Sequence, residues 1–188
     1  DPFIVMPSAD LGKAVAAAVA ARIQNAGQSC ICGKRMIVHA DIHDAFLERF
    51  IAAMAAVKVG DPMDAANDIG PLSSEEQRDT VLDQLAQFQA AGAKLVGGDP
   101  LPGKGAYMTP GVLTHVPPDH PVAQEEVFGP VAMVFAVADI DAAIALATER
   151  GCARITLLTD EDNNQAQWFY GRAGFRRSAM IPMRRAIP

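Results

Sequence analysis

The chain has 188 residues, half of them hydrophobic, and a formal net charge of −6. This amount of apolar material is sufficient for a sizeable core, which argues against a disordered chain. The acidic balance opposes nucleic-acid binding, because phosphates need clustered Lys and Arg. No apolar run approaches the roughly 20 residues that span a bilayer, and the first residues lack the basic flank of a secretory signal. We therefore expect a cytoplasmic protein with a small-molecule partner and no membrane contact.

The first half of the chain contains strong helix and strand patterns. Residues 11–24 are rich in alanine and predict a helix that is capped by Ser8 or Asp10 and ends at Gly27. A short buried strand is expected at 36–39, and the apolar spacing within 42–57 predicts a second helix. These elements place Cys30 between a helix and a strand.

A further helix is expected after the Ser-Ser-Glu-Glu run at 73–76, with Gly92 as its C-terminal cap, followed by a strand at 94–96. Another helix begins within 139–147. Alternation of short strands with long helices predicts an α/β fold with a mainly parallel sheet.

The chain contains three cysteines, Cys30, Cys32 and Cys152. An odd and small number makes a disulfide framework improbable, so reduced thiols are expected. Cys30 and Cys32 have no second cysteine pair and no histidine pair at zinc spacing, so we predict no metal site.

Cys30 follows a predicted helix and has small or apolar neighbours, which leave room for a carbonyl carbon to approach. A thiolate can add to an aldehyde to form a thiohemiacetal, whose oxyanion is held by the N–H of the cysteine and one further donor. Loss of hydride to a nicotinamide then produces a thioester that water hydrolyses. The alternative is that Cys30 is an inert buried thiol.

Two motifs resemble those of the aldehyde dehydrogenases. Residues 27–30 read Gly-Gln-Ser-Cys and match the family's Gly-Gln-x-Cys signature, and residues 125–130 resemble its Glu-x-Phe-Gly-Pro motif. Their separation of about a hundred residues is also similar, and shorter matches between them follow the family's order. The resemblance extends from residue 1 to about 147 and implies a partial catalytic domain.

This resemblance implies that Cys30 is the nucleophile of an NAD(P)-dependent oxidation of an aldehyde to a carboxylate. It also implies that Glu126 binds the nicotinamide-ribose hydroxyls of NAD or NADP and that Phe128 packs near the nicotinamide. The alternatives are a solvated surface acid at Glu126 and a core aromatic at Phe128. Glu125 is interpreted as structural. The Cys-Ile-Cys run followed by Gly-Lys-Arg is most similar to the succinate-semialdehyde branch.

Cys32 has two interpretations. Two thiols one residue apart could form a strained, reducible disulfide that blocks Cys30, or Cys32 could simply fill core space.

The family's general-base glutamate, its asparagine oxyanion donor and most of its dinucleotide-binding domain precede the position of residue 1. We therefore expect negligible dehydrogenase turnover from this polypeptide alone. A homo-oligomer is possible, but the family interface is incomplete in this chain.

Residues 148–188 resemble the end of a GNAT acetyltransferase, through Asn163, Ala166, Tyr170, Gly174 and Phe175. We expect a strand at 153–159 and a helix at 163–173 there. The pyrophosphate loop of that family is missing, so Tyr170 is interpreted as a helix residue that packs with Trp168 and Phe169. The alternative functions are therefore a non-catalytic truncated or fused fragment and, less favoured, an N-acetyltransferase.

Overall fold

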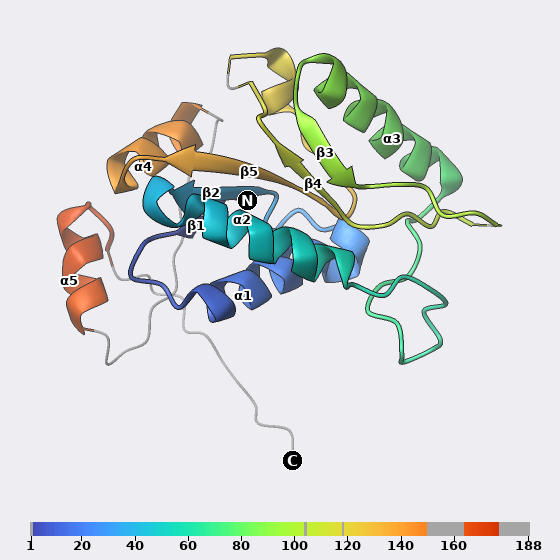
Figure 1. Cartoon of the computed structure of the whole chain (residues 1–188), viewed down its shortest axis with the longest axis horizontal. Helices are drawn as coiled ribbons and strands as arrows, with labels where there is room; N and C mark the ends of the chain where they lie inside the picture. Colours follow the sequence, from blue (N-terminus) through green and yellow to red (C-terminus); the bar gives the residue numbers. More distant parts are fainter. Residues whose placement is uncertain (1, 104, 118, 150–163, 177–188) are drawn as a thin grey trace. The chain divides into compact units, whose positions relative to one another are not determined.

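The computed structural model describes residues 2–103, 105–117, 119–149 and 164–176. Contacts divide the chain into two compact units, Asp1–Ala153 and Arg154–Pro188, and each is described by itself. The first unit is built on one five-stranded sheet with the order β1-β2-β5-β4-β3 (Figure 1). Its strands are β1 (Pro2–Val5), β2 (Arg35–His39), β3 (Lys94–Gly97), β4 (Gly111–Thr114) and β5 (Val131–Val137).

The sheet is mainly parallel. The pairs β1–β2, β2–β5 and β4–β5 are parallel, whereas β3 pairs antiparallel with β4 at one edge. In the central pair Arg35 lies opposite Met133 and His39 opposite Val137. The predicted α/β class with a mainly parallel sheet is confirmed.

Helix α1 (Leu11–Ile23) precedes the short 3-10 turn η1 (Gln24–Gly27). The side chain of Asp10 caps α1 by accepting a hydrogen bond from the N–H of Lys13 at 3.0 Å, so Asp10 rather than Ser8 is the cap. The helix presents Val15, Ala18 and Arg22 to the interior, at the spacing of one helical face.

Helix α2 (Ala40–Ala55) packs beside α1 and against β2 and β4. Its buried side chains Phe46, Phe50 and Met54 recur every four residues, and the two phenylalanine rings stack at 5.3 Å. Together α1 and α2 cover one face of the sheet (Figure 1).

Helices α3 (Glu75–Ala90) and α4 (Ile140–Glu149) pack against the other face (Figure 1), with the short turn η2 (Pro121–Gln124) near α3. Ser74 caps α3 by accepting from the N–H of Gln77 at 3.0 Å. Gly92, with φ of 101°, follows the last turn of α3 as predicted.

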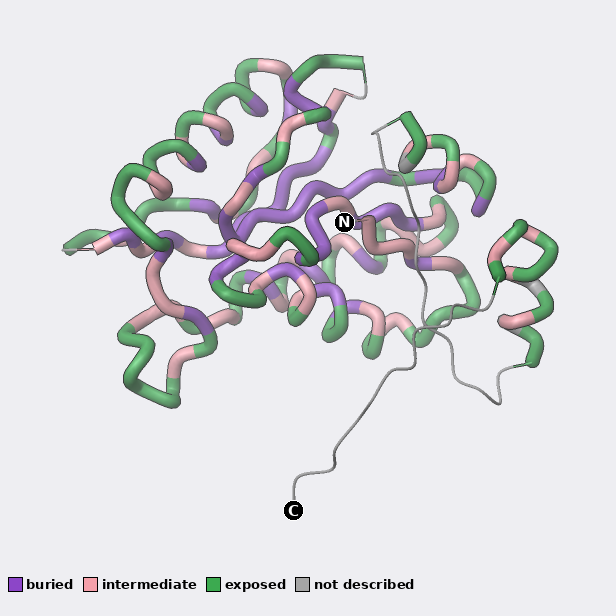
Figure 2. Tube along the Cα trace, turned by 180° about the vertical axis from the view of Figure 1, so that it is seen from behind, coloured by how far each residue is buried: buried purple, intermediate pink, exposed green. Residues whose placement is uncertain are grey.

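Strand β5 lies between these layers and is buried almost throughout (Figure 2). Its alternate side chains contact opposite layers, because successive strand residues point to opposite faces. Met133 and Phe135 pack in the cluster beneath α3, while Ala132 and Val134 pack beneath α1 and α2. The sheet is therefore the middle layer of three.

In the second unit the structure describes helix α5 (Asn164–Arg172), which lies within the predicted 163–173 helix. Tyr170 contacts Phe175 edge to face at 5.8 Å, and burial raises the pKa of the Tyr170 hydroxyl. Trp168 is 63% exposed, and the Arg172 guanidinium lies 4.9 Å from its ring centroid. The packing of Tyr170 with Trp168 and Phe169 against a covering element stays a prediction.

Several predictions about the C-terminal part lie partly or wholly outside the described residues. These are the strand at 153–159 and the roles of Asn163 and Cys152. Helix α4 continues through Glu149, past the position between residues 147 and 148 where the aldehyde dehydrogenase resemblance is expected to end. That domain boundary stays a prediction. Among the described helices, none combines the length and apolarity needed to cross a membrane.

Candidate functional site

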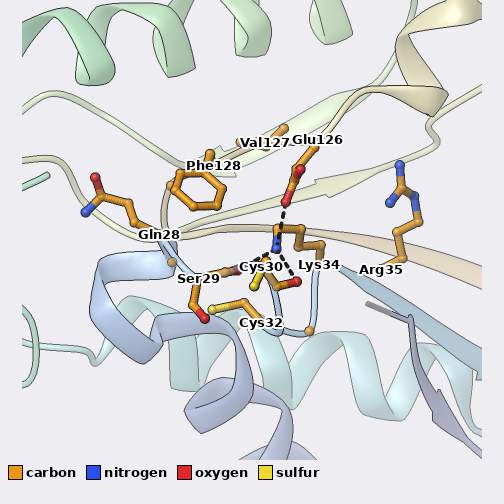
Figure 3. A network of polar contacts seen from close by, with 12 residues as sticks. Gln28, Ser29, Cys30, Cys32, Lys34, Arg35, Glu126, Val127 and Phe128 are labelled. Carbon is orange, nitrogen blue, oxygen red and sulfur yellow. Dashed lines mark hydrogen bonds and ion pairs between the residues drawn. The ribbon is translucent and has the colours of Figure 1, made fainter. Parts of the chain in front are cut away.

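The two predicted motifs meet at one end of the sheet, where β2 and β5 begin. Residues 27–34, here called the nucleophile segment, lead into β2, and residues 123–130, the carboxylate segment, lead into β5. Because β2 and β5 are parallel neighbours, the segments that precede them emerge side by side at the amino ends of the strands. Motifs about a hundred residues apart in sequence are thereby adjacent in space (Figure 3).

A turn with left-handed backbone precedes Cys30. Asn25, Ala26 and Gly27 have φ values of 51°, 51° and 76°, which carry the chain out of α1. A Cβ atom added at Gly27 would collide with the carbonyl of Gly129. A glycine is therefore required at this position of the Gly-Gln-Ser-Cys motif for two reasons: its φ is positive, and the carboxylate segment approaches it closely.

The two cysteines of the motif differ in exposure. Cys30 is exposed, whereas Cys32 is fully buried. The Cys32 Sγ lies 3.4 Å from the carbonyl oxygen of Gln24. The exposure of Cys30 argues against the inert buried alternative. Cys32 occupies core space, and its role as a redox partner of Cys30 stays a prediction.

Lys34 connects the two segments through the ammonium group of its buried side chain, which is only 3% exposed. The Nζ donates to the carbonyl oxygens of Ser29 at 2.6 Å and Cys30 at 3.2 Å, and lies 2.9 Å from Oε1 of Glu126 (Figure 3). It also lies 5.6 Å from the centroid of the Phe128 ring. One cation thus contacts the nucleophile segment and both predicted cofactor residues.

Glu126 and Phe128 are both accessible to solvent, as cofactor contacts must be. The Glu126 side chain is 54% exposed, and its hydrogen bond with Lys34 lowers the pKa of the carboxyl group. Phe128 is half-buried, which differs from a core aromatic. An ionised, accessible carboxylate fits the vicinal hydroxyls of a ribose. The roles of both residues stay predictions.

Arg22 is the second buried cation at this site. It is fully buried on α1, and its guanidinium donates to the carbonyls of Gly27 at 2.9 Å, Val127 at 3.4 Å and Gly129. Burial lowers the pKa of Arg22 to about 10, so the group is still a cation at neutral pH. Arg22 joins the same two segments as Lys34.

Side chains from other elements bond every carbonyl from residue 123 to residue 129. Arg35 donates to those of 123, 124 and 125, Gln84 to 126, Arg22 to 127 and 129, and Gln77 to 128. Gln84 also donates to Oε2 of Glu125 at 3.1 Å, in line with a structural role for that carboxylate. Four side chains therefore set the path of the carboxylate segment.

Gln28 ties the nucleophile segment to the start of α3. Its Oε1 accepts a hydrogen bond from the N–H of Ser73 at 2.9 Å, while Gln77, one turn into α3, donates to the carbonyl of Phe128 at 3.0 Å. The beginning of α3 is thus a common support for both motifs.

Two surface depressions of about 430 and 340 Å³ are not lined by Cys30, Glu126 or Phe128. The larger is lined by residues 23–26 and part of the 62–71 loop, and the smaller by the end of α3, residues 120–122 and Glu125. Among the described residues, no group of three or more His, Cys, Asp or Glu side chains could hold a metal ion.

The supporting residues Arg22, Lys34, Gln77 and Gln84 are not among the residues predicted from the sequence. Arg22 stands in an alanine-rich helix, and Lys34 follows the motif directly, but neither has a fixed partner in the sequence. An isolated cation on the buried face of an otherwise apolar helix, as Arg22 is, was the available signal. Gln77 and Gln84, seven residues and thus two turns apart on α3, offered a weaker one.

A sequence model of the aldehyde dehydrogenase family matches residues 1–173 of this chain. The match includes residues 148–173, part of the segment that resembles the end of a GNAT acetyltransferase. The chain is 55% identical over 148 residues to "Succinate-semialdehyde dehydrogenase [NADP(+)]" of Mycolicibacterium paratuberculosis, covering 78% of this chain and 31% of that protein. Its counterpart from Mycobacterium ulcerans is 54% identical over the same length and is 32% covered.

Solved structures show the same similarity. A 3,6-anhydro-L-galactose dehydrogenase "in Complex with NAP" is 40% identical with a TM-score of 0.74, over 78% of this chain and 32% of that one. Lactaldehyde dehydrogenase from Escherichia coli is 38% identical with a TM-score of 0.75, over 78% and 31%. This chain spans about a third of the length of the relatives it matches.

Proposed function

Because the chain belongs to the aldehyde dehydrogenase family, we propose that it carries the nucleophile, Cys30, for NAD(P)-dependent oxidation of an aldehyde to a carboxylate. The observation that carries this proposal is the contact of one buried ammonium, Lys34, with both the Cys30 segment and Glu126. Through this contact, the exposed Cys30 and the exposed Glu126 carboxylate lie at the same end of the sheet, where β2 and β5 begin.

The reaction begins at the Cys30 sulfur. Its thiolate adds to the aldehyde carbon, a C–S bond forms, and the carbonyl electron pair moves to the oxygen, which the N–H of Cys30 can stabilise. A bound nicotinamide dinucleotide would supply the hydride acceptor that converts the thiohemiacetal to a thioester. Water then releases the carboxylate and returns the Cys30 thiolate.

Glu126 and Phe128 are the residues that would hold the nicotinamide end of NAD or NADP. The Glu126 carboxylate can accept hydrogen bonds from ribose hydroxyls, and the half-buried Phe128 ring offers an apolar contact. Glu126 is a poor candidate for the hydrolytic base, because a carboxylate with a lowered pKa binds protons weakly. We therefore propose negligible turnover for this polypeptide by itself.

The aldehyde that we propose is succinate semialdehyde, on the strength of the relatives that bear that name. An aldehyde that forms a thiohemiacetal withdraws the thiol from alkylation. Succinate semialdehyde is therefore expected to protect Cys30 from iodoacetamide better than butanal does. Equal protection by both aldehydes would argue against the semialdehyde.

Iodoacetamide labelling with peptide mapping tests the nucleophile itself. Cys30 should react faster than both Cys32 and Cys152, and Cys30→Ser should remove the fast phase. Equal rates at the three cysteines would contradict an activated site. An assay with NAD, NADP and succinate semialdehyde should give no significant rate, and a rate like that of the longer relatives would refute the turnover proposal.

The alternative of a non-catalytic fused fragment, or of acetyl transfer by the tail, is tested separately. Acetyl transfer requires a coenzyme A site, whose ligand would raise the melting temperature. Failure of acetyl-CoA to shift the melting temperature would exclude that activity.

A further inference from the structure

The peptide group between Ser29 and Cys30 has a special position in the proposed chemistry. Its N–H belongs to Cys30 and is the donor that would face the oxyanion, whereas its C=O belongs to Ser29. In a planar trans peptide these two groups are rigidly connected and point in opposite directions. Whatever holds the Ser29 oxygen therefore sets the direction of the Cys30 N–H.

Lys34 holds that oxygen. Its Nζ donates to it at 2.6 Å, and the N–H of Cys32 donates to the same oxygen at 3.2 Å. Among the hydrogen bonds of the described residues, none engages the N–H of Cys30, which belongs to an exposed residue. The peptide group is thus fixed at its carbonyl end and open at its N–H end.

We propose that Lys34 is a positioning residue for the oxyanion donor: its ammonium fixes and polarises the Ser29–Cys30 peptide group and links it to the Glu126 carboxylate. The proposal rests on the function proposed for Cys30. Lys34 acts through the peptide group and touches neither substrate nor the reacting sulfur in this role.

The ammonium group has no donor left for another task. An ammonium has three N–H bonds, and Lys34 has three oxygen partners, on Ser29, Cys30 and Glu126 (Figure 3). With only 3% of its side chain exposed, Lys34 is also shielded from ligands. This arrangement separates a positioning role from the role of a cation that binds an anionic substrate.

Two physical effects give Lys34 influence over the oxyanion. A charge-assisted hydrogen bond to the carbonyl is shorter and stronger than a neutral one, so it restricts rotation of the peptide plane. It also polarises the peptide, and coupled hydrogen bonds strengthen one another by roughly 10–30%. Complete removal of an oxyanion donor costs about 100-fold to 1,000-fold in rate, so disorientation should cost about tenfold.

Two reagents separate this role from mere support of the fold. With p-nitrophenyl acetate, the Cys30 thiolate adds to the carbonyl carbon, an oxyanion forms, and the C–O bond breaks to release p-nitrophenolate and leave a thioester. With iodoacetamide, the thiolate displaces iodide and no oxyanion forms. The ratio of the two rate constants at Cys30 therefore measures oxyanion stabilisation apart from thiol reactivity.

We expect Lys34→Met to lower this ratio about tenfold, Lys34→Gln to lower it less, and Lys34→Arg to stay within about threefold of the unmodified chain. The matched control is Lys94→Met, an exposed lysine on the edge strand β3, which should leave the ratio unchanged. In addition, the Cys30 amide resonance of cysteine-15N-labelled protein should shift in Lys34→Met more than in Lys94→Met.

Should Lys34→Met fail to fold by circular dichroism, Lys34→Gln decides the question. A ratio within twofold of the unmodified chain in the folded neutral variant would overturn the role of Lys34. Failure of the proposed function is recognised differently, because Cys30 of the unmodified chain would then react no faster than Cys152 with either reagent.

Discussion

The nucleophile segment and the carboxylate segment are held in shape by different means. The nucleophile segment follows a left-handed turn at Asn25–Gly27 and is closed by its own short-range backbone bonds, such as Cys32 N–H to Ser29 at 3.2 Å. The carboxylate segment also has short-range backbone bonds, such as Glu125 N–H to Val122 at 3.1 Å, but in addition its seven consecutive carbonyls from 123 to 129 accept from side chains of other elements.

This difference shows that one site can combine a segment held by residues near in sequence with a segment held by residues of other helices and strands. The carbonyls of the nucleophile segment bond side chains that are close in sequence, such as Arg22 and Lys34, and its Gln28 side chain adds one distant bond, to Ser73. The carboxylate segment acquires its geometry only when α1, β2 and α3 are in place, because they carry Arg22, Arg35, Gln77 and Gln84. Substitutions in these supports should therefore disturb the carboxylate segment first.

The largest effect is expected for Arg22→Met. The change leaves the buried carbonyls of Gly27 and Val127 without a donor and removes one of the two donors to the Gly129 carbonyl, which also accepts from the N–H of Val131. We expect a loss of about 3 kcal/mol in the free energy of unfolding, measured by urea denaturation. The control is Arg49→Met, an exposed residue of α2, which should change stability by less than about 0.5 kcal/mol. Equal losses would show that Arg22 does not join the segments.

Gly27→Ala should have the next largest effect, about 2 kcal/mol, because the residue has φ of 76° and its Cβ would collide with the Gly129 carbonyl. Gly92→Ala separates the two causes, since Gly92 has φ of 101° but open space around it. Thermal denaturation of both variants should show the smaller loss at Gly92. The reverse order would mean that the approach of the two segments is not tight.

Gln84→Ala should cost about 1 kcal/mol, through loss of its bonds to Oε2 of Glu125 and the carbonyl of Glu126. The exposed Gln89 on the same helix provides the matched control. Hydrogen exchange or limited proteolysis should show faster opening near residue 126 in Gln84→Ala alone. Unchanged opening would indicate that the carboxylate segment does not depend on α3.

The smallest effect concerns pH. Lys34 lowers the pKa of Glu126 below the unfolded value, so this pair stabilises the fold above the ordinary glutamate pKa, and the contribution is lost as pH falls through the folded pKa. Between pH 7 and pH 3, Glu126→Gln should therefore lose less stability than the unmodified chain. The difference should stay below about 1 kcal/mol, because the carboxylate is half exposed.

A double variant checks the cause of that pH effect. If Lys34 is the partner, Lys34→Met should abolish the pH-dependent difference that Glu126→Gln makes. A difference of the same size in the Lys34→Met background would assign the effect to other charges.

Much of the fold follows from local sequence patterns. The helical spacing of Phe46, Phe50 and Met54, and the capping residues Asp10 and Ser74, are visible before folding, because caps and helical faces depend on near neighbours. Strand β5 was not assigned, since a strand buried on both faces has an unbroken apolar run without alternation.

The sequence by itself determined the family resemblance, the mainly parallel α/β fold, and Cys30, Glu126 and Phe128 as candidate site residues. Only the tertiary structure decided that Lys34 and Arg22 connect these motifs. The physical reason is that both cations bond backbone carbonyls, which every residue possesses. A motif of side chains can be recognised in one dimension, but the choice of carbonyl depends on which strands become neighbours.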